Sequence, residues 1–145
     1  MKRLSEKTAA ITGASQGIGL AVAREFAAQG ADLALCSVDD LAEKTAAELA
    51  AEFGVRALGA KVDVSVPKQC EDFVKLVLDE LGGLDILVNN AGVARDNLAV
   101  RLDETQWDMV LDVNLKGAFF MSEAALKHMM RNRGGRIINM SSVVG

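Results

Sequence analysis

Short apolar segments and longer amphipathic segments alternate along the whole chain. The short segments are bounded by Gly, Asp or Asn and cover residues 7–12, 31–36, 55–64, 84–89 and 135–140. Short, continuous apolar runs with such boundaries are typical of strands buried in a parallel sheet. The pattern therefore predicts five strands.

The segments between these strands repeat apolar residues at helical spacing. Ile18, Val22 and Phe26 recur every fourth residue, and a second periodic segment covers 41–53. A third, introduced by Pro67, carries the clearest stripe, which consists of Cys70, Phe73, Val74, Val77, Leu78 and Leu81. Proline is tolerated in a first helical turn. The alternation predicts an α/β fold: a single domain over residues 1–145 with a Rossmann-like, doubly wound parallel sheet of strand order 3-2-1-4-5.

The fourth predicted helix, residues 104–128, is apolar on two faces. One stripe consists of Trp107, Val110, Leu111, Leu115, Ala118 and Phe119, and the other of Met109, Val113, Gly117, Phe120 and Ala124. A helix of this kind has two burial partners. The sheet would cover one face, and either a further part of the protein or another subunit would cover the second. We expect a dimer or tetramer when the protein is full length.

Composition and charge exclude several classes of partner. The chain has 145 residues, a net charge of -4 and 50% hydrophobic residues. Neutralising phosphates takes an excess of Lys and Arg, so we expect no nucleic-acid or anionic-membrane partner. No segment approaches the roughly 18 apolar residues of a membrane span, and no secretory signal precedes the domain. The separated Cys36 and Cys70 suggest neither a disulfide framework nor a metal site. We expect a cytoplasmic protein.

A glycine-rich segment, TGASQGIG at 12–19, joins the first strand to the first helix. Gly13, Gly17 and Gly19 permit a tight turn and a close backbone approach, and the helix N-terminus that follows attracts anions. The spacing G-x3-G-x-G differs from the commoner dinucleotide fingerprint. The segment is interpreted as a cradle for a dinucleotide pyrophosphate, or alternatively as a plain strand-to-helix turn.

Two further strand ends carry polar residues. Asp63 and Val64 end the third strand, where a carboxylate and a backbone N–H could bind an adenine edge, and Asn89 to Gly92 end the fourth. Taken singly, these residues could be turn or cap residues. The carboxyl ends of parallel strands line one crevice, so the three segments together favour a ligand site there.

With these motifs the chain resembles the short-chain dehydrogenases/reductases. TGxxxGIG, NNAG, the Asn114 of VNLKG and the serine strand IINMSS follow that family's order and spacing from about residue 8 to the end. Within the family, GVARDNLAVRL (92–102) and GGRIINMSSVVG (134–145) are most similar to the 3-oxoacyl-[acyl-carrier-protein] reductases.

The resemblance implies roles for particular residues. Ser142 would be the catalytic serine, with Ser141 the weaker candidate, and Asn114 would hold a proton-relay water through its backbone. Asn114 also stands on an otherwise apolar stripe, where a buried amide needs partners, although it could simply be satisfied in the core or bend the helix. The cofactor would be held by Gly13, Ala14, Ser15, Gln16, Gly17, Ile18, Gly19, Asp63, Val64, Asn90, Ala91 and Gly92.

The family's catalytic Tyr-x-x-x-Lys is absent, since the chain contains no tyrosine. In the family this motif follows the serine by a dozen or so residues. We therefore expect an N-terminal fragment of a longer enzyme, truncated after the fifth strand, that binds better than it reacts. A non-catalytic dinucleotide-binding module that ends at Gly145 is the alternative.

Residues after the second strand bear on the choice of cofactor. An acid there favours NAD and a nearby Arg favours NADP. The position carries Ser37, which favours NADP, whereas Gln16 in the glycine loop and the nearby Asp39 and Asp40 speak for NAD. We expect NADP, with NAD possible.

The resemblance implies reduction of a 3-oxoacyl thioester on acyl carrier protein, in fatty-acid synthesis. Another short-chain dehydrogenase, acting on a small-molecule carbonyl or alcohol such as a sugar, polyol or steroid, is the alternative. A basic run could dock the acidic carrier, or could be cations at a helix C-terminus; it consists of Lys127, Arg131, Arg133 and Arg136.

Overall fold

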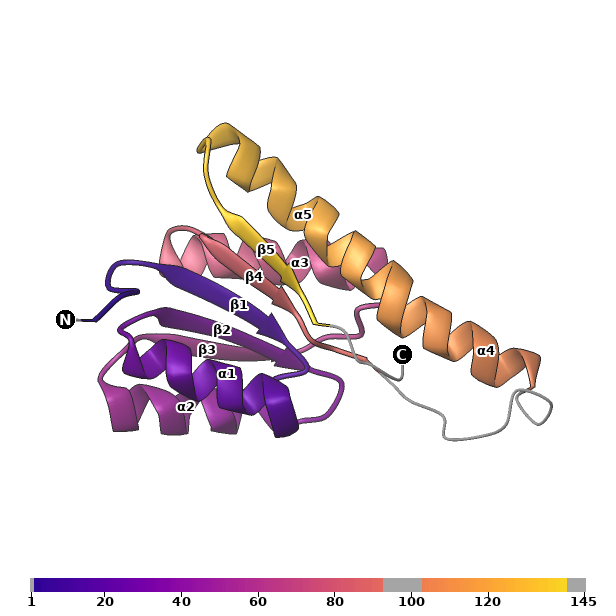
Figure 1. Cartoon of the computed structure of the whole chain (residues 1–145), viewed down its shortest axis with the longest axis horizontal. Coiled ribbons are helices and arrows are strands. Elements are labelled where there is room, and N and C mark those ends of the chain that lie inside the picture. Colours follow the sequence, from indigo (N-terminus) through magenta and orange to yellow (C-terminus); the bar gives the residue numbers. More distant parts are fainter. Residues whose placement is uncertain (1, 93–102, 141–145) are drawn as a thin grey trace.

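A single parallel sheet forms the centre of the molecule (Figure 1). The computed structural model describes residues 2–92 and 103–140. The strand order is β3-β2-β1-β4-β5 and each neighbouring pair is parallel, so the predicted fold and strand order are confirmed. The strands are β1 (Thr8–Thr12), β2 (Asp32–Ser37), β3 (Ala57–Lys61), β4 (Ile86–Asn89) and β5 (Arg136–Asn139).

Helices cover both faces of this sheet (Figure 1). The helical elements are α1 (Gly17–Ala28), α2 (Ala42–Phe53), α3 (Pro67–Leu81), α4 (Glu104–Val110), the π-helical segment η2 (Leu111–Lys116) and α5 (Gly117–Arg131). Pro67 occupies the first turn of α3, as its sequence position predicts. Among the described helices, none combines the length and the apolar character needed to span a bilayer.

Alternate residues of each strand supply two separate cores. In β2, Leu33 and Leu35 point to the core shared with α1 and α2, while Ala34 and Cys36 point to the core shared with α3 and α5. All four are fully buried. This alternation follows from the two-residue period of a strand, and burial on both faces explains why the strands are apolar throughout. The predicted third strand, 55–64, is longer than the observed β3.

The predicted single helix over 104–128 is interrupted by η2. The chain stays helical to Arg131, but residues 111–116 adopt the wider π-helical turn. Such segments insert extra backbone into a helix and are frequent at functional sites. The insertion changes which side chains share a face before and after it.

The two predicted apolar stripes of this helical region have different surroundings. Val113 and Phe120 pack on the core, and Gly117 is buried, as the second stripe requires. Half of the first stripe is exposed: Trp107, Leu115 and Phe119 have exposed fractions of 55%, 67% and 62%. One of the two expected burial partners is therefore the core of the domain.

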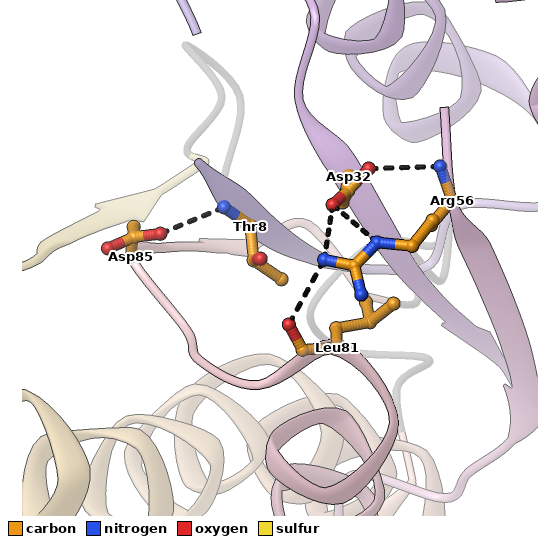
Figure 2. Close-up of polar contacts among 5 residues, drawn as sticks. All are labelled: Thr8, Asp32, Arg56, Leu81 and Asp85. Carbon is orange, nitrogen blue, oxygen red and sulfur yellow. Dashed lines mark hydrogen bonds and ion pairs between the residues drawn. The ribbon is translucent and has the colours of Figure 1, made fainter. Parts of the chain in front are cut away.

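A polar network ties the elements together at the amino-terminal edge of the sheet (Figure 2). The guanidinium of Arg56 donates to Asp32 Oδ2 at 2.9 and 2.7 Å and to the Leu81 carbonyl at 3.3 Å. On the neighbouring strands, the Thr8 backbone N–H donates to Asp85 Oδ2 at 2.9 Å. The candidate site lies at the opposite, carboxyl edge of the sheet.

Candidate functional site

A cavity of about 360 Å³ lies at the carboxyl ends of the strands. The loop after β1, the ends of β2, β3 and β4, and η2 all contribute to its wall. Its lining residues are Gly13, Ser15, Gln16, Gly17, Ile18, Cys36, Ser37, Val38, Asp39, Val62, Val64, Asn90, Ala91, Gly92 and Val113. The three strand ends that the sequence predicts to converge therefore do meet, in the crevice where open α/β sheets bind ligands.

The glycine loop presents the N-terminus of α1 to this cavity. Gly13 and Gly17 have φ of +62° and +59°, which β-carbon-bearing residues rarely adopt. The helix starts at Gly17 with no side-chain cap from Gln16 and no acidic residue in its first turn. The first backbone N–H groups and the positive end of the helix dipole therefore favour an anion.

Two glycines allow this loop to lie against the end of β4. A Cβ at Gly19 would overlap the Gly13 carbonyl oxygen and the Asn90 Nδ2, and a Cβ at Gly13 would lie 2.8 Å from the Ala91 Cα. Gly17 differs, because its Cβ would meet no described residue within 4 Å. Gly13 and Gly19 are therefore needed for close packing, whereas Gly17 is needed for its backbone conformation.

The hydroxyl of Thr12 links the first and fourth strands beside the cavity. Its Oγ1 accepts the backbone N–H groups of Asn90 at 3.0 Å and Ala91 at 2.8 Å. The Asn90 side chain in turn donates to the Gly13 carbonyl at 3.1 Å. Thr12 was not predicted as a site residue. The feature of the sequence that could have indicated it is a hydroxyl side chain at the last position of the central strand.

Three of the predicted cofactor residues do not line the cavity among the residues described. Ala14 is fully buried and its N–H donates to the Cys36 carbonyl at 3.2 Å, and Gly19 lies beneath the loop. Asp63 Oδ1 accepts the backbone N–H of Ser65 at 3.0 Å and its hydroxyl at 2.6 Å, which forms the turn into α3. Its neighbour Val64 does line the cavity.

At the end of β2, Ser37 and Asp39 form one polar cluster. Asp39 Oδ1 accepts the Ser37 hydroxyl at 2.7 Å and the Leu41 N–H at 3.0 Å, and Asp39 Oδ2 accepts the Ser15 hydroxyl at 2.8 Å. The backbone N–H of Leu41 and these two hydroxyls hold the pKa of Asp39 below its usual value. The Asp39 carboxylate, which the sequence analysis named as a feature that speaks for NAD, thus lies at the cavity, and its bonds to Ser15 and Ser37 were not predicted.

Asn114 lies in η2, close to the end of β4. A Cβ at Gly92 would lie 3.0 Å from the Asn114 Oδ1, and Val113 next to it lines the cavity. The prediction that Asn114 is buried on an apolar stripe is wrong, because this residue is exposed. Ser142 and Ser141 lie outside the described residues.

A pair of amide side chains, the buried Asn89 and the exposed Asn139, joins the ends of β4 and β5. Asn89 Nδ2 donates to Asn139 Oδ1 at 2.9 Å and to the Ser122 hydroxyl at 3.0 Å, so it joins β4, β5 and α5. Among the described residues, the buried Asn89 Oδ1 has no hydrogen-bond partner. The pair links the end of β4 to the end of β5, the strand that precedes Ser142 in the sequence.

The two cysteines have no reactive character. Both are fully buried, and Cys70 Sγ donates to the Val64 carbonyl at 3.3 Å. Burial raises the pKa of Cys36 above its usual value and that of Cys70 to about 11. Within the part of the chain that the structure describes, no three His, Cys, Asp or Glu residues are grouped so that they could hold a metal ion.

Comparison with known proteins gives a consistent family. The family model for short chain dehydrogenase matches residues 7–145. The chain is 42% identical over 143 residues to a 3-oxoacyl-[acyl-carrier-protein] reductase of Vibrio cholerae, of which it covers 57%. It is 38% identical over 148 residues to the reductase of that name from Aquifex aeolicus, of which it covers 58%. The chain thus spans somewhat more than half the length of these relatives.

A solved structure shares the fold. L-sorbose reductase from Gluconobacter frateurii, complexed with NADPH and L-sorbose, superimposes with a TM-score of 0.90 and 35% sequence identity. The match covers 97% of this chain and 54% of that one.

Proposed function

Because this chain belongs to the short-chain dehydrogenase family, we propose that it forms the cofactor-binding part of a reductase acting on 3-oxoacyl thioesters bound to acyl carrier protein. Identities of 38–42% to reductases of that name support this substrate class. The same relatives and the family's chemistry support a role in fatty-acid synthesis. The chain covers only part of these relatives, so the activity is proposed for the full-length protein.

The open N-terminus of α1, facing a glycine-lined cavity, is the observation that carries this proposal. The pyrophosphate of a nicotinamide dinucleotide would lie on the backbone of residues 13–19, where the hydroxyl of Ser15 and the amide of Gln16 also face the cavity. Each such anion contact contributes about 0.3–2 kcal/mol. The residues present therefore fit this cofactor.

The other two strand ends would hold the two halves of the dinucleotide. Val64, and Asp63 through its backbone, would contact the adenine. The carboxylate of Asp63 is less suited to bind the adenine edge as predicted, because it already accepts the N–H and the hydroxyl of Ser65. Asn90, Ala91 and Gly92 would contact a ribose and the nicotinamide side. The bond between Asn90 and Gly13 keeps this end of the cavity in register with the glycine loop.

The chemistry needs a hydride and a proton. A reduced nicotinamide, held by the residues of the cavity, would supply the hydride. Ser142 would bind the carbonyl oxygen through its hydroxyl, and the backbone of Asn114 would hold a water that relays a proton. The π-helical segment supports a functional role for Asn114, because such segments are frequent at functional sites.

The position of the basic run does not favour the docking of a carrier protein near the cavity. Lys127, Arg131, Arg133 and Arg136 are all exposed, but they lie where α5 ends and β5 begins, at the opposite end of the sheet from the cavity (Figure 1). Charge reversal by Arg133→Glu in the full-length enzyme tests this hypothesis. A raised Michaelis constant for the carrier-bound substrate supports docking there, and an unchanged one removes it.

A sugar reductase is the second candidate, favoured by the structural likeness to L-sorbose reductase. The full-length protein should be assayed for oxidation of NADH or NADPH with a 3-oxoacyl thioester and, separately, with L-sorbose. Turnover with the thioester alone supports the proposal, whereas turnover with the sugar alone replaces it. Cofactor binding without turnover of any carbonyl compound would instead indicate a non-catalytic module.

Cofactor choice within this proposal follows two opposing features. The sequence favours NADP because Ser37 is uncharged, and the L-sorbose reductase structure contains NADPH. The carboxylate of Asp39 in the same cluster opposes this choice.

A further inference from the structure

Two sets of hydrogen bonds hold the end of β4, one on each side. On the side of β1, the Thr12 hydroxyl accepts the backbone N–H groups of Asn90 and Ala91. On the side of β5, Asn89 Nδ2 donates to Asn139 Oδ1 at 2.9 Å, and these two asparagines are directly paired in the parallel register. Because Asn90 and Ala91 line the cavity, the bond between Asn89 and Asn139 joins the cavity wall to the end of β5.

The amide of Asn89 has a fixed direction. The residue is only 6% exposed, and the two donors of its amide nitrogen are both used, one toward Asn139 and the other toward the Ser122 hydroxyl of α5. Its Oδ1 accepts no hydrogen bond from the residues that the structure describes. A half-satisfied amide gains less from burial than a fully paired one, so stability alone does not account for an asparagine here.

The strand β5 has few other restraints on its position. Within the described part of the chain it pairs with β4 alone, and three of its four residues are exposed. Another side-chain hydrogen bond of this strand, from Arg136 to the Gly135 carbonyl, is local and reaches no other element. Just past the strand, the Met140 N–H donates to the Asn89 carbonyl at 3.0 Å. Asn89 therefore holds the end of β5 through both its side chain and its backbone.

We propose that Asn89 and Asn139 are positioning residues: the bond between their side chains sets the distance from the end of β5 to the nicotinamide side of the cavity, residues 90–92. The inference rests on the proposed function, in which Ser142, three residues after Asn139 in the sequence, binds the substrate carbonyl. Hydride transfer depends steeply on this distance, because the reacting atoms must lie about 3–3.5 Å apart. The cofactor side keeps its place without the bond, because Thr12 holds it from β1. The bond therefore matters for the chemical step and not for cofactor affinity.

The test measures kcat with a 3-oxoacyl thioester and the dissociation constant of the reduced cofactor, both in the full-length protein. Asn139→Leu has a similar size and no acceptor, whereas Asn139→Asp keeps an acceptor oxygen for Asn89. Asn139→Leu should lower kcat on the order of tenfold or more, the scale of a misplacement below about 1 Å. It should change the dissociation constant less than about twofold. Asn139→Asp should retain most of kcat.

A matched control makes the same change at another exposed amide. Asn132→Leu alters the residue that caps the C-terminus of α5, at the amino-terminal edge of the sheet, and should leave kcat and the dissociation constant unchanged. If leucine at 139 prevents folding, Asn139→Ala also removes the acceptor and gives the same comparison with Asn139→Asp.

Two further readouts separate positioning from a merely structural role. With a cofactor deuterated at the transferred hydride, Asn139→Leu should raise the isotope effect on kcat, because hydride transfer becomes more rate-limiting. Hydrogen exchange of the Met140 amide, which reports on the end of β5 without turnover, should become faster in Asn139→Leu and stay slow in Asn139→Asp. Combining Asn89→Leu with Asn139→Leu should lower kcat no further than the more harmful single change, since both remove one bond.

An unchanged kcat in Asn139→Leu would overturn the inference while leaving the proposed function standing. So would an equal loss of kcat in Asn139→Asp and Asn139→Leu, or losses that multiply in the double variant. If the unmodified protein reduces no carbonyl compound with either NADH or NADPH, the proposed function itself fails, and this inference with it.

Discussion

Replacement of Gly19 by alanine tests how the glycine loop is held against β4. The added Cβ would overlap the Gly13 carbonyl oxygen and the Asn90 Nδ2, which are themselves hydrogen-bonded at 3.1 Å. Because the obstructing carbonyl belongs to the backbone, a rotamer change alone cannot relieve the overlap. Either the start of α1 or the end of β4 must move.

The expected loss of stability can be worked out from three contributions. Overpacking costs about 1–3 kcal/mol, and the loss of the Asn90 to Gly13 hydrogen bond costs about 0.5–1.5 kcal/mol. Alanine in a helix is favoured over glycine by up to about 1 kcal/mol, which offsets part of this. We expect Gly19→Ala to lower the free energy of unfolding by about 0.5–4.5 kcal/mol, and the middle of this range moves the urea midpoint down by roughly 1 M.

The assay combines urea unfolding with cofactor binding in the full-length protein. Gly83→Ala is the matched control, since its Cβ would meet no described residue within 4 Å and its φ is not positive. The stability of this variant should change by less than about 0.5 kcal/mol. Displacement of the α1 N-terminus should also weaken dinucleotide binding by at least about tenfold, a loss of one or more phosphate contacts. An unchanged midpoint together with unchanged affinity would show that the contact is not as close as described.

Two other features give separate predictions. Thr12→Val keeps the shape but removes the acceptor of the Asn90 and Ala91 N–H groups, and should lower the free energy of unfolding by about 1–3 kcal/mol in urea titrations; an unchanged midpoint would contradict the linking role. Cys36 and Cys70 should not react with a thiol reagent in the native state, and both should react once the protein is unfolded. Because burial raises the pKa of Cys70 to about 11, its contribution to stability is complete at neutral pH and decreases as pH rises from about 8.5 toward 11. Rapid native-state labelling, or stability that is flat over that pH range, would contradict the burial of these thiols.

Local patterns in the sequence were enough for the architecture. The two kinds of periodicity identify buried strands and core-facing helices because each period follows from backbone geometry. The position of Pro67 in the first turn of α3 and the glycine turn at Gly13 and Gly17 are likewise local, since they depend on the allowed φ of single residues. The convergence of three strand ends then follows from the parallel sheet alone.

Contacts between distant parts of the chain had to be seen in the tertiary structure. Ser15 and Asp39 are 24 residues apart and Thr12 and Asn90 are 78 apart, and no periodicity relates such pairs. The exposure of Asn114 depends on how η2 rotates its helix against α3 and the sheet, which a stripe in the sequence does not encode. The sequence therefore determined where the cavity would form, whereas only the packing showed that Ser15 and Ser37 hold the Asp39 carboxylate at its wall.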